Sequence, residues 1–273
     1  MLSTFALTVL TSLVATPILS AAPQGTHADD VKAYKEILKD RERESEAIAL
    51  IDGFTNRYAE HSERMIEIAD AIEIDEGDIP ALKKESKKLV EAQEDLADLV
   101  WLSFKERKRD TEGHRRLWTS AVFAFGQMGP TGAKYLWKAY EDKRFRKDVE
   151  FRGRCVQQVG STLDWDQWED LVDLLDHHED LIIAKAAEAL KHYREAPGKI
   201  RVEVTSKLVN FLNSYYNAAN NPEDTTARQR YRMVGRPMRE ALSEMTGQSF
   251  QDPLKWRLWF NDNKKNKEIW SDD

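Results

Sequence analysis

The feature that most constrains the fold is a pattern of small and apolar residues that recurs in the second half of the chain. It first covers residues 121–140, AVFAFGQMGPTGAKYLWKAY, returns 34 residues later as RCVQQVGSTLDWDQWEDLVDLL, and returns again after about 31 residues as DLIIAKAAEALKHY. Each unit fits a pair of helices that cannot bury its apolar face alone. Repeats of this length therefore predict stacked helix pairs, that is, an α-solenoid.

Small residues set the spacing of these predicted helices. Gly126 in the first copy is matched by Gly160 in the second, and Ala121 is matched by Cys155. Such residues let two helices approach closely, and Gly129-Pro130 supplies a turn between the two helices of the first pair. The third copy, which begins at Asp180, is expected to pair with a helix over about residues 202–216.

The region before the repeats is dominated by heptad spacing. Two stripes of apolar residues predict two long helices, although Arg41 and Glu44 interrupt the first stripe and Gly53 could break it. Asp78 is placed to cap the second helix, with Pro80 in its first turn. Helices joined by the short acidic loop at 73–79 should form an antiparallel hairpin over residues 29–110, which could also self-associate through its heptads. The stripes are Tyr34, Ile37, Ile48, Ile51, Tyr58, Met65, Ala69 and Ile72, then Leu82, Leu89, Ala92, Leu96 and Leu99.

Charge and aromatic content change near residue 110. Residues 29–110 hold 15 basic and 23 acidic side chains and one Trp, whereas residues 111–273 hold 26 and 25 and the other seven Trp. This change predicts two regions, a hairpin over 29–110 and a solenoid with a Trp-rich C-terminal cap over 111–273. The chain as a whole has a net charge of −7 and a single Cys. This composition excludes an internal disulfide framework and a Cys-rich zinc module.

Residues 1–28 contain no charged side chain, and Leu2 to Leu19 form an apolar run that is broken by Pro17. Small residues follow this run, which is typical of an export signal, with an uncleaved membrane anchor as the alternative. We therefore expect an exported protein whose mature chain has no membrane span.

A search for catalytic and metal-binding motifs gives no positive case for an enzyme. The densest group of possible metal ligands is Asp176-His177-His178-Glu179-Asp180, but neighbouring residues on a helix point in different directions. Cys155 lies among apolar residues, which suits a core position better than a nucleophile. GxSxG, Walker and dinucleotide-binding motifs do not occur. The sequence therefore predicts no enzymatic activity, no cofactor and no metal.

Five arginines lie within twelve residues and form the most basic stretch of the chain. Guanidinium groups bind phosphate, sulfate and carboxylate in a bidentate manner, so one hypothesis is a polyanion-binding patch for acidic polysaccharide or nucleic acid. The alternative is that the arginines pair with nearby acids such as Glu240 and Glu244. The patch consists of Arg228, Arg230, Arg232, Arg236 and Arg239.

The repeats and the tail resemble a known family. Residues 121–140 and 178–193 resemble HEAT-like repeats of the short phycobilisome-lyase type. The tail resembles the closing segment of exported HEAT-repeat proteins of planctomycete-like bacteria, through Met245-Thr246-Gly247, Asp252 and the pair Trp256 and Trp259. This resemblance covers about residues 111–265, and it implies a periplasmic or extracellular bacterial scaffold rather than a lyase.

A scaffold of this kind presents helix faces to a partner protein without covalent chemistry. The second helix of each pair is expected to line the concave partner surface. The residues predicted for this surface are Lys134, Lys138, Asp166, Asp170, Asp173 and Lys207.

Overall fold

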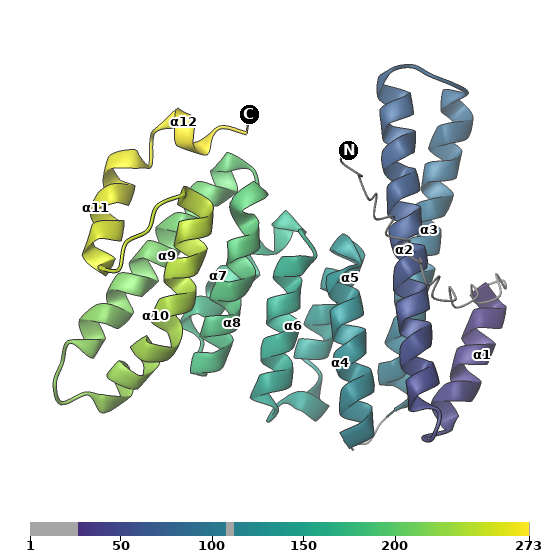
Figure 1. Cartoon of the computed structure of the whole chain (residues 1–273), viewed down its shortest axis with the longest axis horizontal. Helices are drawn as coiled ribbons and strands as arrows, with labels where there is room; N and C mark the ends of the chain where they lie inside the picture. The colour runs from purple at the N-terminus through teal and green to yellow at the C-terminus, as the bar shows by residue number, and fades with distance from the viewer. Residues whose placement is uncertain (1–26, 108–111, 273) are drawn as a thin grey trace, which may run out of the picture.

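The computed structural model describes residues 27–107 and 112–272, in which every regular element is a helix (Figure 1). The all-α fold class is therefore confirmed. The predicted signal segment, residues 1–28, lies outside the described residues except for His27 and Ala28, which begin the first helix. No helix in the described part combines the length and the apolar character that a membrane span requires.

Twelve α-helices are seen in the described residues, with short 3-10 turns at 143–145, 165–167, 174–176 and 191–195. They are α1 (His27–Lys39), α2 (Glu44–Glu73), α3 (Ile79–Glu106), α4 (Glu112–Gly126), α5 (Gly129–Tyr140), α6 (Val149–Ser161), α7 (Trp168–Asp173), α8 (Asp180–Leu190), α9 (Gly198–Ala219), α10 (Thr225–Thr246), α11 (Pro253–Asn263) and α12 (Lys267–Trp270).

The N-terminal region has three helices where the heptad pattern predicts two. The chain turns between α1 and α2, where the Asp40 side chain accepts a hydrogen bond from the Glu42 N–H at 2.9 Å and the Asp40 carbonyl accepts one from Arg107 at 2.7 Å. Of the two polar residues that interrupt the heptad stripe, Arg41 is exposed in this turn, whereas Glu44 is buried at the start of α2. Gly53 does not break α2, which is helical throughout.

The long helices α2 and α3 run antiparallel, and their tip projects beyond the rest of the molecule (Figure 1). Asp78 caps α3 by accepting a hydrogen bond from the Ala81 N–H at 3.1 Å, and Pro80 lies in the first turn. The tight tip needs left-handed backbone at Asp75 (φ 56°) and Gly77 (φ 87°). The predicted hairpin cap is therefore confirmed at the residues that were expected to form it.

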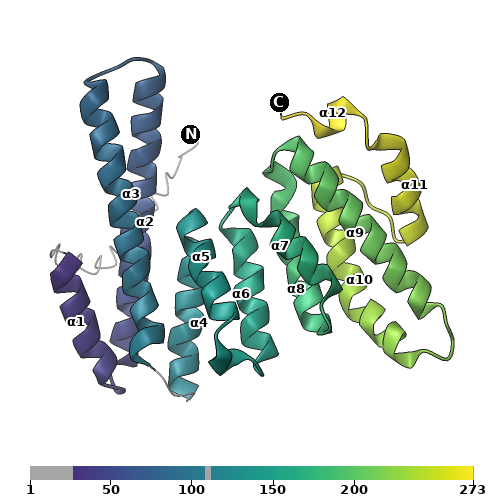
Figure 2. The ribbon, with the colours of Figure 1, turned by 180° about the vertical axis from the view of Figure 1, so that it is seen from behind.

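The remaining helices stack beside the hairpin in two layers (Figures 1 and 2). In one layer α2, α4, α6, α8 and α10 pack in succession, and in the other α3 contacts α5 and α7 contacts α9. One difference from the predicted pairing concerns α8. It packs mainly on α6 and α10 rather than on α9, from which the 3-10 turn Lys191–Glu195 separates it along the chain.

Small residues allow the close helix contacts that the repeat pattern predicts. A Cβ atom added to Gly160 would lie 2.6 Å from the Cα of Ala189, so α6 and α8 meet backbone to backbone. Cys155 is fully buried on α6, and burial raises the pKa of its thiol. A single continuous core of buried apolar side chains runs from α1 through the stack to α12.

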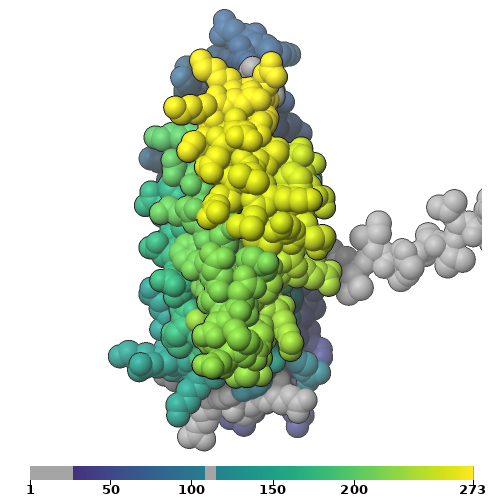
Figure 3. Space-filling model, turned by 90° about the vertical axis from the view of Figure 1, so that its left-hand side faces the viewer, coloured from purple at the N-terminus to yellow at the C-terminus, as the bar shows by residue number. Residues whose placement is uncertain are grey.

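The C-terminal helices lie over the end of the stack (Figure 3). Asp252 caps α11 by accepting a hydrogen bond from the Leu254 N–H at 2.9 Å. Trp256 is fully buried against the core, and the partly buried Trp259 faces Trp270 at 6.3 Å between ring centroids. Leu258 instead remains exposed on the outer face of α11.

Candidate functional site

A hollow of about 530 Å³ lies between the hairpin and the edge of the stack. One wall is a face of α2, and the opposite wall is formed by the α4–α5 turn and by the end of α6. Two large apolar side chains at this site are open to solvent, since Ile66 is 63 % exposed and Leu163 is 47 % exposed. Apolar groups that converge on one hollow are typical of a recognition surface. We call this region the hairpin groove.

The α2 wall follows from helical periodicity. The side chains that line it are three or four residues apart and therefore share one face of the helix. Near the base of the groove this face packs on the stack and Tyr58 is buried, whereas further along it Ile66 has no covering helix. The floor is tied to α3 by Gln93, whose Nε2 donates to the Tyr58 carbonyl at 3.3 Å and to Ser62 Oγ at 2.7 Å. The wall residues are Tyr58, Ser62, Met65, Ile66 and Ala69.

The opposite wall ends on a leucine in an unusual backbone conformation. Leu163 has φ 55°, a left-handed region that costs a bulky residue about 1–2 kcal/mol. Its turn is held by Thr162, whose hydroxyl donates to the Val159 carbonyl at 2.6 Å and accepts from the Asp164 N–H at 3.3 Å. A strained residue that presents an exposed leucine to a hollow is a candidate for a functional role.

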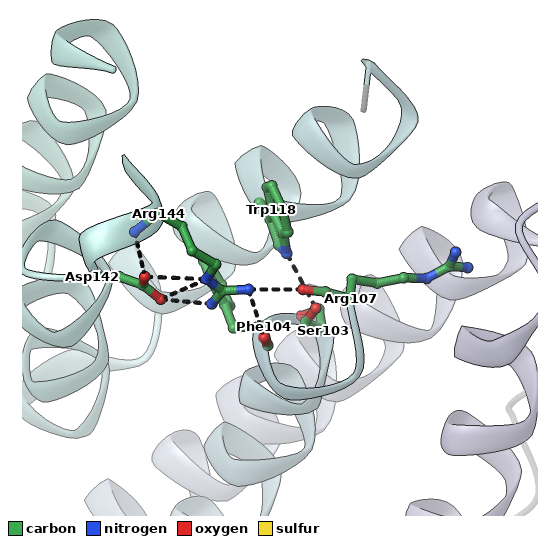
Figure 4. A network of polar contacts seen from close by, with 6 residues as sticks. All are labelled: Ser103, Phe104, Arg107, Trp118, Asp142 and Arg144. Atoms are coloured by element: carbon green, nitrogen blue, oxygen red, sulfur yellow. Dashed lines mark hydrogen bonds and ion pairs between the residues drawn. The ribbon is translucent and has the colours of Figure 1, made fainter. Parts of the chain in front are cut away.

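The position of the hairpin relative to the stack depends on a network around Arg144 (Figure 4). Its Nη1 donates to the carbonyls of Phe104 at 3.0 Å and Arg107 at 2.8 Å, at the C-terminal end of α3. The guanidinium also pairs with Asp142, with 2.6 Å between Nη2 and Oδ2. Burial disfavours the charged carboxylate, but the hydrogen bonds from Arg144 hold the pKa of Asp142 below its usual range.

Trp118 completes this junction from α4. Its indole Nε1 donates to the Ser103 carbonyl at 3.1 Å, and its ring lies 5.4 Å from the Arg144 guanidinium. The end of α3 is thereby joined to α4 and to the turn before α6 (Figure 4). The junction joins α3 to α4, and the Gln93 hydrogen bonds join α3 to the α2 wall, so both walls of the groove are held in place through α3.

The residues predicted for the partner surface lie in the second layer, on α5, on the segment 165–173 and on α9, away from the hairpin groove. Lys138 Nζ lies 4.6 Å from the Trp101 ring centroid, and Lys134 Nζ lies 5.6 Å from that of Tyr135, so both amines cover aromatic rings. The aspartates are exposed beside one another, and Lys207 is exposed on α9. The aspartates are Asp166, Asp170 and Asp173.

The predicted arginine patch lies on α10, which continues as a helix through Pro237. Arg230 pairs with Asp180 at 2.5 Å, and Arg236 pairs with Glu240 at 2.6 Å. Arg239 donates to the Tyr231 hydroxyl at 3.1 Å, and Arg228 donates to the backbone carbonyls of Asn221 and Pro222, which leaves Arg232 exposed between them. Protein groups therefore already occupy most of the guanidinium groups of this patch.

The other motifs also have definite positions. Within residues 27–107 and 112–272, no three His, Cys, Asp or Glu side chains lie close enough together to hold a metal ion. His177 accepts a hydrogen bond from the Glu179 N–H at 3.0 Å at the turn before α8.

The sequence analysis did not identify Ile66 or Leu163 as groove residues, and it assigned Met65 and Ala69 to helix packing rather than to the groove. The one sequence signal for the groove was Ile66, a large apolar residue that lies next to the heptad stripe rather than on it.

Three partly buried histidines predict a pH dependence of stability. Burial lowers the pKa of His61, His177 and His192, so the fold favours their neutral form. As pH falls, the unfolded chain binds these protons first, and stability is lost below a pH of about 6.5. We expect the urea midpoint to fall between about pH 7 and about pH 5, and to fall less when all three are replaced by glutamine. If the urea midpoint of the glutamine variant falls by as much as that of the parent over this pH range, the three histidines are not the cause of the pH dependence.

Comparison with known proteins adds no relative, because no protein-family model, curated protein or solved structure matches this chain.

Proposed function

We propose that this chain is a non-catalytic scaffold whose hairpin groove binds a helical segment of a partner protein. The observation that carries the proposal is the convergence of exposed Ile66 and Leu163 on one hollow between rigid elements. The resemblance to HEAT-like repeats supports the same class of function, because such stacks act by presenting helix faces. The apolar segment at residues 1–28 supports action in an exported compartment.

The shape and chemistry of the groove favour an amphipathic helix as the occupant. Apolar positions spaced three and four residues apart on a partner helix can fill a groove of this kind. Burying Ile66 and Leu163 removes apolar area from water, which stabilises the complex by about 25 cal/mol for each Å² buried. Ordering costs on the scaffold side are small, because the Arg144 network already fixes the junction of hairpin and stack.

Charge indicates the polar face of the partner. Asp70 and Glu73 are exposed on α2 next to the groove-lining residues, and the hairpin region carries a net charge of −8. Complementary charge raises the rate of association and selects among partners. The expected ligand is therefore a helix with an apolar face flanked by lysine or arginine.

Defined peptides test this proposal. An amphipathic leucine–lysine peptide of about three heptads is expected to bind the full chain in fluorescence anisotropy, and its leucine–glutamate counterpart is expected to bind more weakly. Replacing Ile66 and Leu163 together by serine should weaken binding at least about tenfold, since each lost apolar contact is worth about 1 kcal/mol.

The matched control is Val90→Ser, which removes another exposed apolar side chain of the hairpin outside the groove. It should leave peptide binding unchanged. Equal binding of the two peptides, or an equal loss in the Val90 variant, would show that the groove is not the binding site.

A further inference from the structure

The tip of the hairpin combines an exposed apolar side chain with a group of acids. Ile74 is 68 % exposed at the point where the chain reverses between α2 and α3. Four acidic side chains surround it within six residues, and among the described residues none of them forms an ion pair: Glu73, Asp75, Glu76 and Asp78. The left-handed residues Asp75 and Gly77 give this loop a defined shape. We call it the acidic tip.

A hollow of about 480 Å³ with the opposite charge lies at the far end of the stack, between the start of α9 and α12. Its apolar part is formed by Val202 and Trp270, and four exposed lysines surround it: Lys199, Lys264, Lys265 and Lys267. In the described part of the chain these lysines make no ion pair with a carboxylate. The nearby Asp272 is already used, since it accepts from the Gly198 N–H and lies 3.9 Å from Arg201. We call this region the lysine hollow.

We propose that the acidic tip of one copy of this chain binds in the lysine hollow of a second copy. The carboxylates of Glu73, Asp75 and Glu76, which have no partner in the described structure, meet four lysines that make no ion pair, while Asp78 keeps its role as the cap of α3. Ile74 meets the apolar part formed by Val202 and Trp270. The tip does not reach the hollow within one copy, because the α2–α3 tip and helices α9 and α12 lie apart along the long axis of the molecule (Figure 1). This inference does not depend on the hairpin groove.

The contact joins two different surfaces, so it is head to tail. Each copy that binds through its tip still offers an open hollow, and such an interface builds chains unless the rotation closes a ring. A short loop in a hollow buries less than the roughly 1,200 Å² of a stable complex, so the association should be weak. We expect a dissociation constant on the order of 100 μM. Exposed charges contribute to it, so it should weaken with salt.

Sedimentation of the full chain tests the proposal. The average mass is expected to rise above that of the 31.6 kDa monomer as concentration increases at low salt, and to return toward it at about 0.5 M salt. The tip variant Ile74→Ser, Glu76→Lys and the hollow variant Lys264→Glu, Lys265→Glu should each sediment as monomers. All four positions are exposed, so both variants should keep the circular dichroism of the parent chain.

Mixing the two variants gives the decisive result. The tip variant retains an intact hollow and the hollow variant retains an intact tip, so a mixture should form a dimer and no larger species. The control Lys255→Glu, Arg257→Glu changes the same charges on α11 outside the hollow and should associate as the parent does. A parent that stays monomeric at every concentration, self-association of either variant, or a mixture that stays monomeric would overturn the proposal.

Discussion

Replacing Trp118 by alanine is expected to lower the free energy of unfolding by about 3–5 kcal/mol, the range for deleting a buried large aromatic side chain. The indole is almost fully buried where α3, α4 and the turn before α6 meet. Its ring packs edge-on against Phe145 at 4.9 Å between centroids and lies 6.1 Å from Phe104. The truncation leaves a cavity and removes the donor to the Ser103 carbonyl. Urea unfolding followed by circular dichroism measures the loss.

The variant Trp118→Phe separates the two contributions. It keeps most of the aromatic volume but removes the Nε1 hydrogen bond to Ser103, so a smaller loss of about 1–3 kcal/mol is expected from the unpaired buried carbonyl and the reduced volume. If alanine and phenylalanine cost the same, the hydrogen bond rather than the packing holds the junction. If neither variant loses stability, the hairpin and the stack are not joined through Trp118.

Replacing Gly160 by alanine is the second large effect, with an expected loss of about 2–3 kcal/mol. The added Cβ would lie 2.6 Å from Ala189 Cα and 2.8 Å from Ala189 C, and both atoms belong to the backbone. A backbone cannot rotate out of the way as a long side chain can, so α6 and α8 must move apart. Their separation exposes apolar side chains at the centre of the stack, including Val156 and Ile183.

Gly53 provides the matched control, because it lies inside α2 and a Cβ added there meets no atom within 4 Å. Gly53→Ala should raise stability by about 1 kcal/mol through helix propensity alone. The two glycine-to-alanine changes are therefore expected to have opposite signs in the same urea experiment. A destabilising Gly53 variant, or a neutral Gly160 variant, would contradict this account of the helix contacts.

Local pattern was sufficient for the helical class of the chain and for the capped starts of α3 and α11. The capping residues Asp78 and Asp252 act on the first turn of their own helices, and the heptad and small-residue spacings report which face of a helix is apolar. The break after Lys39 was harder to predict, because the polar heptad positions Arg41 and Glu44 did not show whether the chain bends or only exposes a turn. Contact between α1 and the base of the hairpin decides this point.

The pairing of charges was not predictable from sequence distance. Arg230 binds Asp180, fifty residues earlier in the chain, whereas the lysines of the C-terminal helices have acids close in sequence and pair with none in the described structure. The dense arginine stretch of α10 is therefore largely paired within the fold, whereas the more scattered lysines of the C-terminal helices remain available to bind another molecule. Ion pairs depend on which helix faces meet, and this is a property of packing.

The sequence by itself determined that the chain is all-α, because helical periodicity, capping residues and the scarcity of glycine and proline act over a few neighbouring residues. Only the tertiary structure decided where binding surfaces lie. Ile66 and Leu163 are ninety-seven residues apart in the sequence, and the acidic tip belongs to the hairpin whereas the lysine hollow lies between α9 and α12. The reason is physical: a groove exists only where packed elements fail to cover one another, and no local pattern encodes that relation.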